Sequence, residues 1–242
     1  MSDLHERETD IGTRTVAENP EEAELSDAIF VPFEKGFEAL KPDVKVEDVR
    51  IETAQLLAMA FNALRWSHQQ VVTGYYAPSV TMARSAYECW LHGTYLNLYP
   101  ARLPEWKRSE KRPRPWRMRQ LVAERMEPDD EARRAELLAA MNDLYQGKKG
   151  HRFSGFSVYS HPSWESIRVL VASDDDGLRL RAGPDYDQNL FRNAFDLFCT
   201  AGLFSAALFG YLLAGAEQDA FMRELDAVKD RVRAWRLRMA TL

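Results

Sequence analysis

The sequence predicts an all-α fold, a helical bundle with long antiparallel helices and a small β-hairpin insertion. Apolar residues recur at spacings of three and four along most of the chain, which is typical of helices that bury one face. Proline and glycine residues separate these periodic segments. Strand-like sequence is limited to residues 167–181, around an Asp-Asp-Asp-Gly turn signal.

Two long helices are expected first, over residues 49–72 and about 78–99. Gly74 suits the end of the first helix and Pro78 the first turn of the second. The short link between them predicts an antiparallel helix pair. The apolar face of the first helix is expected to consist of Ala54, Leu57, Phe61, Leu64, His68 and Val71.

Shorter helices are expected next, over residues 116–126 and 129–145, with Pro128 between them. After the hairpin, residues 186–215 predict a very apolar helix. Residues 217–239 predict an amphipathic one, with an apolar stripe from Phe221 to Met239 at heptad-like spacing. That stripe is a candidate surface for a homodimer.

Residues 1–27 are expected to form a disordered acidic N-terminal segment, and residues 28–242 a single helical-bundle domain. The first 27 residues hold nine acidic and two basic side chains, a composition typical of disorder. No basic segment followed by an apolar one indicates a secretory signal. Cys89 and Cys199 lie in apolar helical runs, so we expect two buried thiols and a cytoplasmic protein.

Residues 197–216 contain no charged side chain. An uncharged stretch of this length could span a membrane. A row of small residues permits close helix packing both in a membrane and in the core of a soluble protein: Gly202, Ala206, Gly210 and Ala214. Arg192 and Asp196 lie near the start of this stretch, and no basic cluster flanks it. We therefore expect a buried core helix and no membrane partner.

One polar stripe runs along the second long helix. Arg84, Glu88 and His92 follow one another at steps of four, so they share one face. Arg84 and Glu88 are expected to form a half-buried ion pair, either as a structural contact or as the wall of a polar pocket. His68, on the apolar face of the preceding helix, is either a core residue or a further member of this pocket.

A second candidate region follows at residues 147–163, where glycines alternate with cations and hydroxyl groups. Arg152 and Ser160 are candidate ligand-binding residues there, because exposed amides beside cations can hold a phosphate. Pro162 restricts His161 to extended backbone, so this corner can present one imidazole to a pocket. If Glu88 lies beside it, His161 becomes a candidate general acid or base.

The basic connector near residues 102–119 carries eight basic and two acidic side chains. Basic residues interleaved with tryptophan suit nucleic-acid backbones and stacked bases, although a solvated loop anchored by two tryptophans has the same composition. The candidate nucleic-acid contacts are Arg108, Arg112, Arg114 and Arg117. No metal site and no cofactor are expected. A di-iron bundle needs a Glu-x-x-His motif on each of two helices, whereas Glu88 and His92 are four residues apart and no second such pair is seen.

Residues 50–215 resemble an uncharacterised family of helical prokaryotic proteins. The resemblance lies in Arg84-x-x-x-Glu88 on a long helix and in the Tyr-Ser-His-Pro-Ser corner at Tyr159–Ser163. More distantly, the chain is similar to the higher-eukaryote-and-prokaryote nucleotide-binding helical domains, many of which are ribonucleases of toxin or phage-defence systems. In those domains the histidine follows the arginine by four to six positions, whereas His161 follows Arg152 by nine positions here.

These observations predict a binding or regulatory protein with a polar pocket at Arg84, Glu88 and His161, in stress or phage defence. The alternative is an RNA- or nucleotide-directed hydrolase that uses His161 as general acid or base. A structural homo-oligomer is the third alternative. Whether the protein is an enzyme is left open by the sequence.

Overall fold

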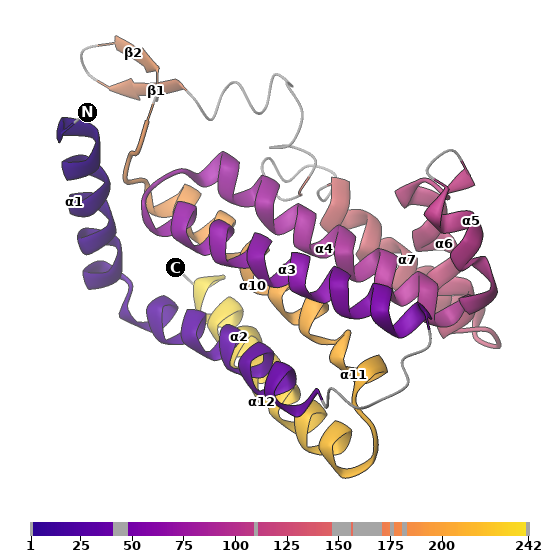
Figure 1. Ribbon diagram of the computed structural model, residues 1–242. Coiled ribbons are helices and arrows are strands. Elements are labelled where there is room, and N and C mark those ends of the chain that lie inside the picture. Colours follow the sequence, from indigo (N-terminus) through magenta and orange to yellow (C-terminus); the bar gives the residue numbers. More distant parts are fainter. Residues whose placement is uncertain are drawn as a thin grey trace.

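The centre of the fold is a layer of three long helices: α3 (Asp48–Val72), α4 (Tyr76–Leu98) and α10 (Gln188–Ala206). In the computed structural model, α3 and α4 run antiparallel and α10 packs against both (Figure 1). The structure describes residues 2–40, 48–108, 111–146, 156, 171–174, 177–180 and 183–240. Over these residues the prediction of an all-α helical bundle is confirmed.

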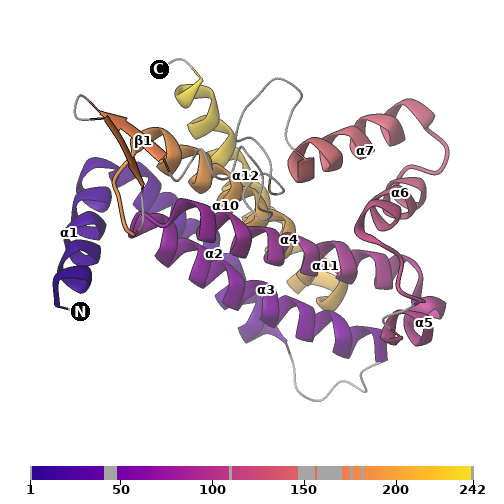
Figure 2. The ribbon, with the colours of Figure 1, turned by 90° about the horizontal axis from the view of Figure 1, so that it is seen from above.

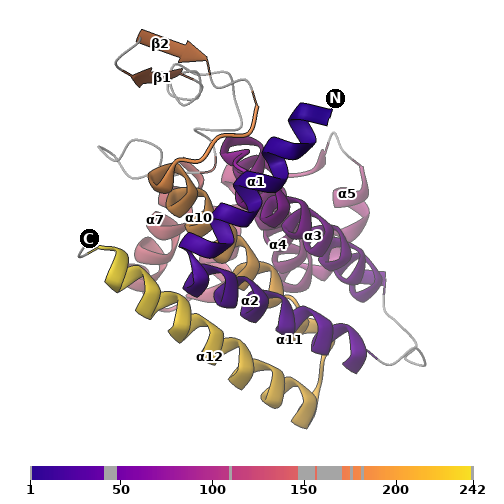
Figure 3. The ribbon, with the colours of Figure 1, turned by 90° about the vertical axis from the view of Figure 1, so that its left-hand side faces the viewer.

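Two helices from opposite ends of the chain cover one side of this layer. α2 (Pro20–Ala39) and α12 (Gly215–Met239) lie side by side (Figure 3), and both contact α10. α1 (Ser2–Glu18) turns away from α2 and reaches α3. The α2–α12 contact includes a buried hydrogen bond, in which Trp235 Nε1 donates to Glu22 Oε1 at 3.0 Å.

Short helices follow the C-terminal end of α4 and pack against it. A single 3₁₀ turn, η1 (Pro100–Arg102), leads into α5 (Leu103–Lys107), and α6 (Pro115–Met126) and α7 (Glu131–Gln146) follow. α6 contacts α4, and α7 contacts α6 (Figure 2). The hydroxyl of Tyr99, just after α4, donates to the Leu121 carbonyl oxygen at 3.0 Å and ties α6 to the layer.

Small side chains allow the central helices to approach one another closely. Ser67 Oγ donates to the Ser79 carbonyl oxygen at 2.9 Å, and Ser205 Oγ donates to the Ala86 carbonyl oxygen at 3.1 Å. A Cβ atom placed on Gly202 would lie 2.6 Å from Ile29 Cγ2, and one on Gly93 would lie 2.7 Å from Leu208 Cδ2. Larger side chains at these positions would force the helices apart.

The predicted disorder of residues 1–27 is wrong, because this segment forms α1 and the first part of α2. The charges that suggested disorder lie mostly on exposed faces, while Leu25 and Ile29 are buried. α2 also continues through Pro32, although a proline inside a helix removes one backbone donor. Tertiary burial therefore overrides composition at the N-terminus.

The apolar segment that could be a membrane span is mostly buried inside the fold. Among the described residues, Gln188–Leu212 is the one helical stretch long and apolar enough to cross a membrane, and 61% of its most apolar window is buried. It is also shorter than the helix predicted over residues 186–215. A turn at Ala207 and Leu208 separates α10 from α11 (Phe209–Leu212).

The apolar stripe of α12 packs against the rest of its own chain. Its members from Phe221 to Trp235 are buried, and Met239 packs partly buried against the same core. The surface predicted for a homodimer is therefore used inside one chain, since α2 and α10 cover it. Whether copies associate through another surface stays a prediction.

Two short strands lie within the interval predicted as a hairpin. The backbone of β1 (Val171–Asp174) pairs antiparallel with that of β2 (Gly177–Leu180), with Val171 opposite Leu180. Both predicted thiols, Cys89 and Cys199, are free and buried.

The close approach at Gly202 gives a direct test of the packing. Gly202→Ala should lower the free energy of unfolding by about 1–3 kcal/mol, because the added methyl group overlaps Ile29. Gly210→Ala is the matched control: its Cβ would meet Met222 Sδ at an ordinary 3.6 Å. The control should be neutral or should raise stability by up to about 1 kcal/mol. Urea denaturation of both variants checks this, and equal destabilisation would contradict the packing described.

Candidate functional site

The predicted ion pair on α4 is present and half-buried. Arg84 Nε donates to Glu88 Oε1 at 2.8 Å, and the two side chains are 15% and 30% exposed. Tyr145, near the end of α7, completes the contact. Its hydroxyl accepts a hydrogen bond from Arg84 and donates one to Glu88 Oε1 at 3.0 Å. α4 and α7 are thus joined by a closed triangle of hydrogen bonds.

Arg119 on α6 lies beside this triangle and is only 1% exposed. Its guanidinium carbon lies 4.3 Å from the centre of the Tyr145 ring, and its Nε donates to Asn142 Oδ1 at 2.9 Å. Its Nη1 is buried without a hydrogen-bond partner among the described residues. Burial lowers the pKa of Arg119, although the nearby Glu88 carboxylate opposes that shift.

Tyr87 adds a second unsatisfied polar group to the same region. Its side chain is fully buried, and its hydroxyl has no hydrogen-bond partner within the described part of the chain. Burial raises the pKa of this hydroxyl, and the nearby charge of Arg119 lowers it in part. The ring packs against Phe156 at a centroid distance of 5.4 Å. We call Arg84, Tyr87, Glu88, Arg119, Asn142 and Tyr145 the polar cluster.

His68 lies in the aromatic core, away from the polar cluster. Its ring centre is 5.8 Å from that of Phe30 and 5.5 Å from that of Phe198. Burial lowers the pKa of His68, so the neutral imidazole is favoured. Of the two alternatives for His68, the structure shows the core residue, because its face of α3 turns toward α2 and α10.

His92 has a hydrogen-bonding role at the start of the basic connector. Trp106 Nε1 donates to His92 Nδ1 at 2.8 Å, and Arg112 stacks over the Trp106 ring at 4.3 Å. Burial and then the charge of Arg112 lower the pKa of His92 to about 4, against an opposing effect of Glu88. His92 is therefore a neutral acceptor that holds the connector on α4.

Two of the four candidate nucleic-acid arginines are engaged within the fold. Arg112 Nε donates to the Trp106 carbonyl oxygen at 3.0 Å, and Arg117 donates to Gln120 Oε1 at 2.9 Å. Arg108 and Arg114 are exposed and form no ion pair with another described residue. Lys107 pairs with Glu52 at 3.0 Å and Arg117 with Glu124 at 3.8 Å, which offsets part of the positive charge of the connector.

Arg152, Ser160 and His161 lie outside the described residues, so the shared site of His161 with Glu88 stays a prediction. Among the described residues, no group of three or more histidine, cysteine or acidic side chains could hold a metal ion.

The structure adds Tyr87, Arg119, Asn142 and Tyr145 to the site. Only Arg119 carried a signal in the sequence, as a cation three residues before the apolar Val122-Ala123 pair of its helix.

No protein-family model, no curated protein and no solved structure matches the chain. The resemblance suggested by the short motifs therefore stays a prediction.

Glu88→Ala should lower the free energy of unfolding by about 1–3 kcal/mol, since Arg84 and Tyr145 both lose their acceptor in a half-buried setting. Glu105→Ala removes a solvent-exposed pair with Arg102 and should leave the unfolding midpoint nearly unchanged. Urea denaturation compares the two variants. Equal effects would mean that the Arg84–Glu88 pair behaves as a surface contact.

The neutral His92 predicts a pH dependence of stability. Its pKa is about 4 in the folded protein against an ordinary 6.5, so the unfolded chain binds the proton more readily. Its contribution is complete above about pH 6.5 and is lost as pH falls toward 4, by at most about 3 kcal/mol. His92→Asn keeps an acceptor near the Nδ1 position and does not titrate, so it should flatten the stability curve in this window. An unchanged slope would contradict the assignment.

Proposed function

We propose that the chain is a binding protein whose polar cluster holds a small molecule with a carboxylate or phosphate group. The observation that carries the proposal is Arg119, a buried guanidinium with an unpartnered Nη1 among the described residues. A buried charge without a counter-charge is costly. Glu88 is the carboxylate whose charge acts on Arg119, and it already pairs with Arg84.

An oxyanion would complete this arrangement chemically. Guanidinium groups bind carboxylates and phosphates through paired, charge-assisted hydrogen bonds, and the Tyr87 hydroxyl would be a further donor. Arg84 and Glu88 keep some exposure, so that side of the cluster is in contact with solvent. The Tyr145 ring and the Asn142 side chain hold the Arg119 guanidinium in place, which orients its donors before a ligand arrives.

A binding function is better supported than the hydrolase or the homo-oligomer alternative. The hydrolase alternative depends on His161, which is not among the described residues. The two described histidines of the central helices, His68 and His92, both have lowered pKa values and are packed or hydrogen-bonded within the fold. The oligomer alternative depends on the α12 stripe, which is buried within one chain.

Arg119→Met tests the proposal. Methionine has similar length and no charge, so the free protein should be as stable as wild type or more stable. Inorganic phosphate, acetate and adenosine monophosphate are the probes, with melting temperature and titration calorimetry as readouts. Wild type should be stabilised by at least one of them, and Arg119→Met should lose that response.

Arg117→Met is the matched control, because Arg117 is exposed on the same helix. It should keep the full response to the anion. A probe preference for adenosine monophosphate over phosphate would indicate a nucleotide, and the reverse would indicate the phosphate group alone. If Arg119→Met loses stability and no anion affects wild type, Arg119 is a structural residue and the proposal fails.

A further inference from the structure

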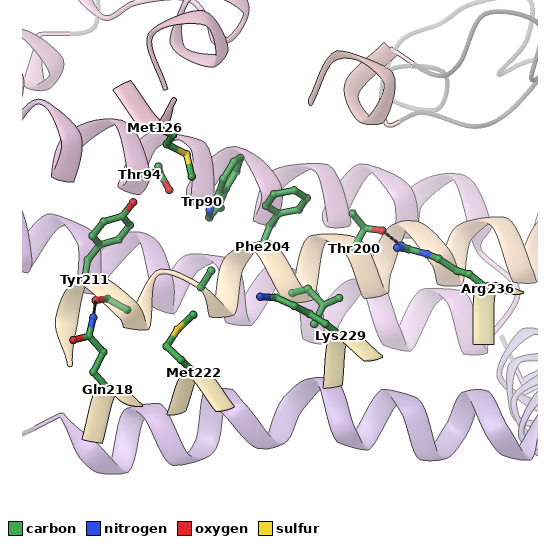
Figure 4. Close-up of a pocket in the computed structure, with 13 residues that line it drawn as sticks. Trp90, Thr94, Met126, Thr200, Phe204, Tyr211, Gln218, Met222, Lys229 and Arg236 are labelled. Carbon is green, nitrogen blue, oxygen red and sulfur yellow. Dashed lines mark hydrogen bonds between the residues drawn. The ribbon is translucent and has the colours of Figure 1, made fainter. Parts of the chain in front are cut away.

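A cavity lies between α4, α6, α10, α11 and α12, apart from the polar cluster (Figure 4). Its volume is about 510 Å³, within the range of roughly 300–1,000 Å³ typical of small-molecule sites. None of the residues of the polar cluster lines it, and its lining comes from five helices.

The floor of this cavity is apolar and aromatic. The rings of Trp90 and Phe204 lie 4.4 Å apart, and both pack against the ring of Tyr87. Leu203 and Met222 extend the apolar lining toward α12. Such a surface offers water few hydrogen bonds, so an aliphatic chain would gain free energy by covering it.

The two ends of the cavity differ in charge. At one end the Tyr211 hydroxyl points toward Thr94, and Gln218 Nε2 donates to the Gly210 carbonyl oxygen at 2.6 Å (Figure 4). Lys229 and Arg236 line the opposite part. They are seven residues apart on α12, so they share one face and lie about 10 Å apart along the axis.

These two cations have carboxylate partners but also spare donors. Lys229 Nζ donates to Asp226 Oδ1 at 2.8 Å, and Arg236 Nε donates to Asp196 Oδ1 at 2.6 Å. Arg236 also donates to Thr200. Both pairs are solvent-exposed, and such pairs exchange partners at little cost. An ammonium has three N–H donors and a guanidinium five, so both can also bind a ligand anion.

We propose that this cavity binds a single-chain amphiphile with an anionic head group. The aliphatic chain lies on the Trp90–Phe204 floor, and the head group contacts Lys229 and Arg236. The volume argues against a docked protein helix, because one turn of helix with its side chains occupies roughly 400 Å³. The cavity would hold little more than one such turn.

The test is titration calorimetry of the full chain with dodecanoate below its micelle concentration. We expect saturable one-to-one binding, and each methylene removed from the probe should weaken Kd about fourfold. Dodecanol and dodecyltrimethylammonium are the head-group controls and should bind at least several-fold more weakly. Equal affinity for all three would overturn the cationic end of the site.

Two variant pairs test the location. Ala207→Phe fills the cavity and should abolish binding, whereas Ala227→Phe, on the exposed face of α12, should bind as wild type does. Lys229→Gln with Arg236→Gln should weaken dodecanoate binding several-fold and leave dodecanol unchanged. Arg231→Gln with Arg233→Gln changes net charge equally on the same helix and should have no effect.

Circular dichroism shows whether Ala207→Phe retains the wild-type fold. If it does not, the paired charge variants decide the outcome. Wild-type affinity in a folded Ala207→Phe variant, or in the Lys229/Arg236 variant, would overturn the proposal. So would the absence of saturable dodecanoate binding by the wild-type protein.

Discussion

The close approach of α10 to α2 and α4 is the constraint on which the other elements depend. Gly202 lies against Ile29 of α2, Gly93 of α4 lies against Leu208, and Ser205 hydrogen-bonds to the Ala86 carbonyl oxygen. Because α10 sits this deep, α2 and α12 can close over it and be joined by the Trp235–Glu22 hydrogen bond. The same depth places Phe204 against Trp90 and so forms the aromatic floor of the apolar cavity.

The polar groups of α4 fall into two kinds that differ in how completely they are satisfied. Arg84, Glu88 and Tyr145 form a closed set of hydrogen bonds, which is sufficient to explain their burial structurally. Arg119 Nη1 and the Tyr87 hydroxyl have no such explanation within the described residues. The ring of Tyr87 also backs the floor of the apolar cavity, so one aromatic residue separates the two candidate binding sites.

Local periodicity predicted the helices well where each one buries a single stripe. α3, α4, α6, α7 and α12 begin and end within a few residues of their predicted bounds. The prediction failed at the N-terminus, where acidic composition hid the buried residues of α2, and at the break between α10 and α11. Both failures have the same cause. A local pattern does not reveal what packs against a segment from elsewhere in the chain.

By itself, the sequence determined the all-α class, most helices and the Arg84–Glu88 pair, because these depend on residues within one or two helical turns of each other. Only the tertiary structure decided what surrounds that pair. Arg119 and Tyr145 come from two later helices, and the cavity lining comes from five. The tertiary structure also decided that His68 faces phenylalanines and that His92 accepts a hydrogen bond from Trp106. Side chains distant in sequence meet only through helix packing, and their spacing along the chain carries no record of that meeting.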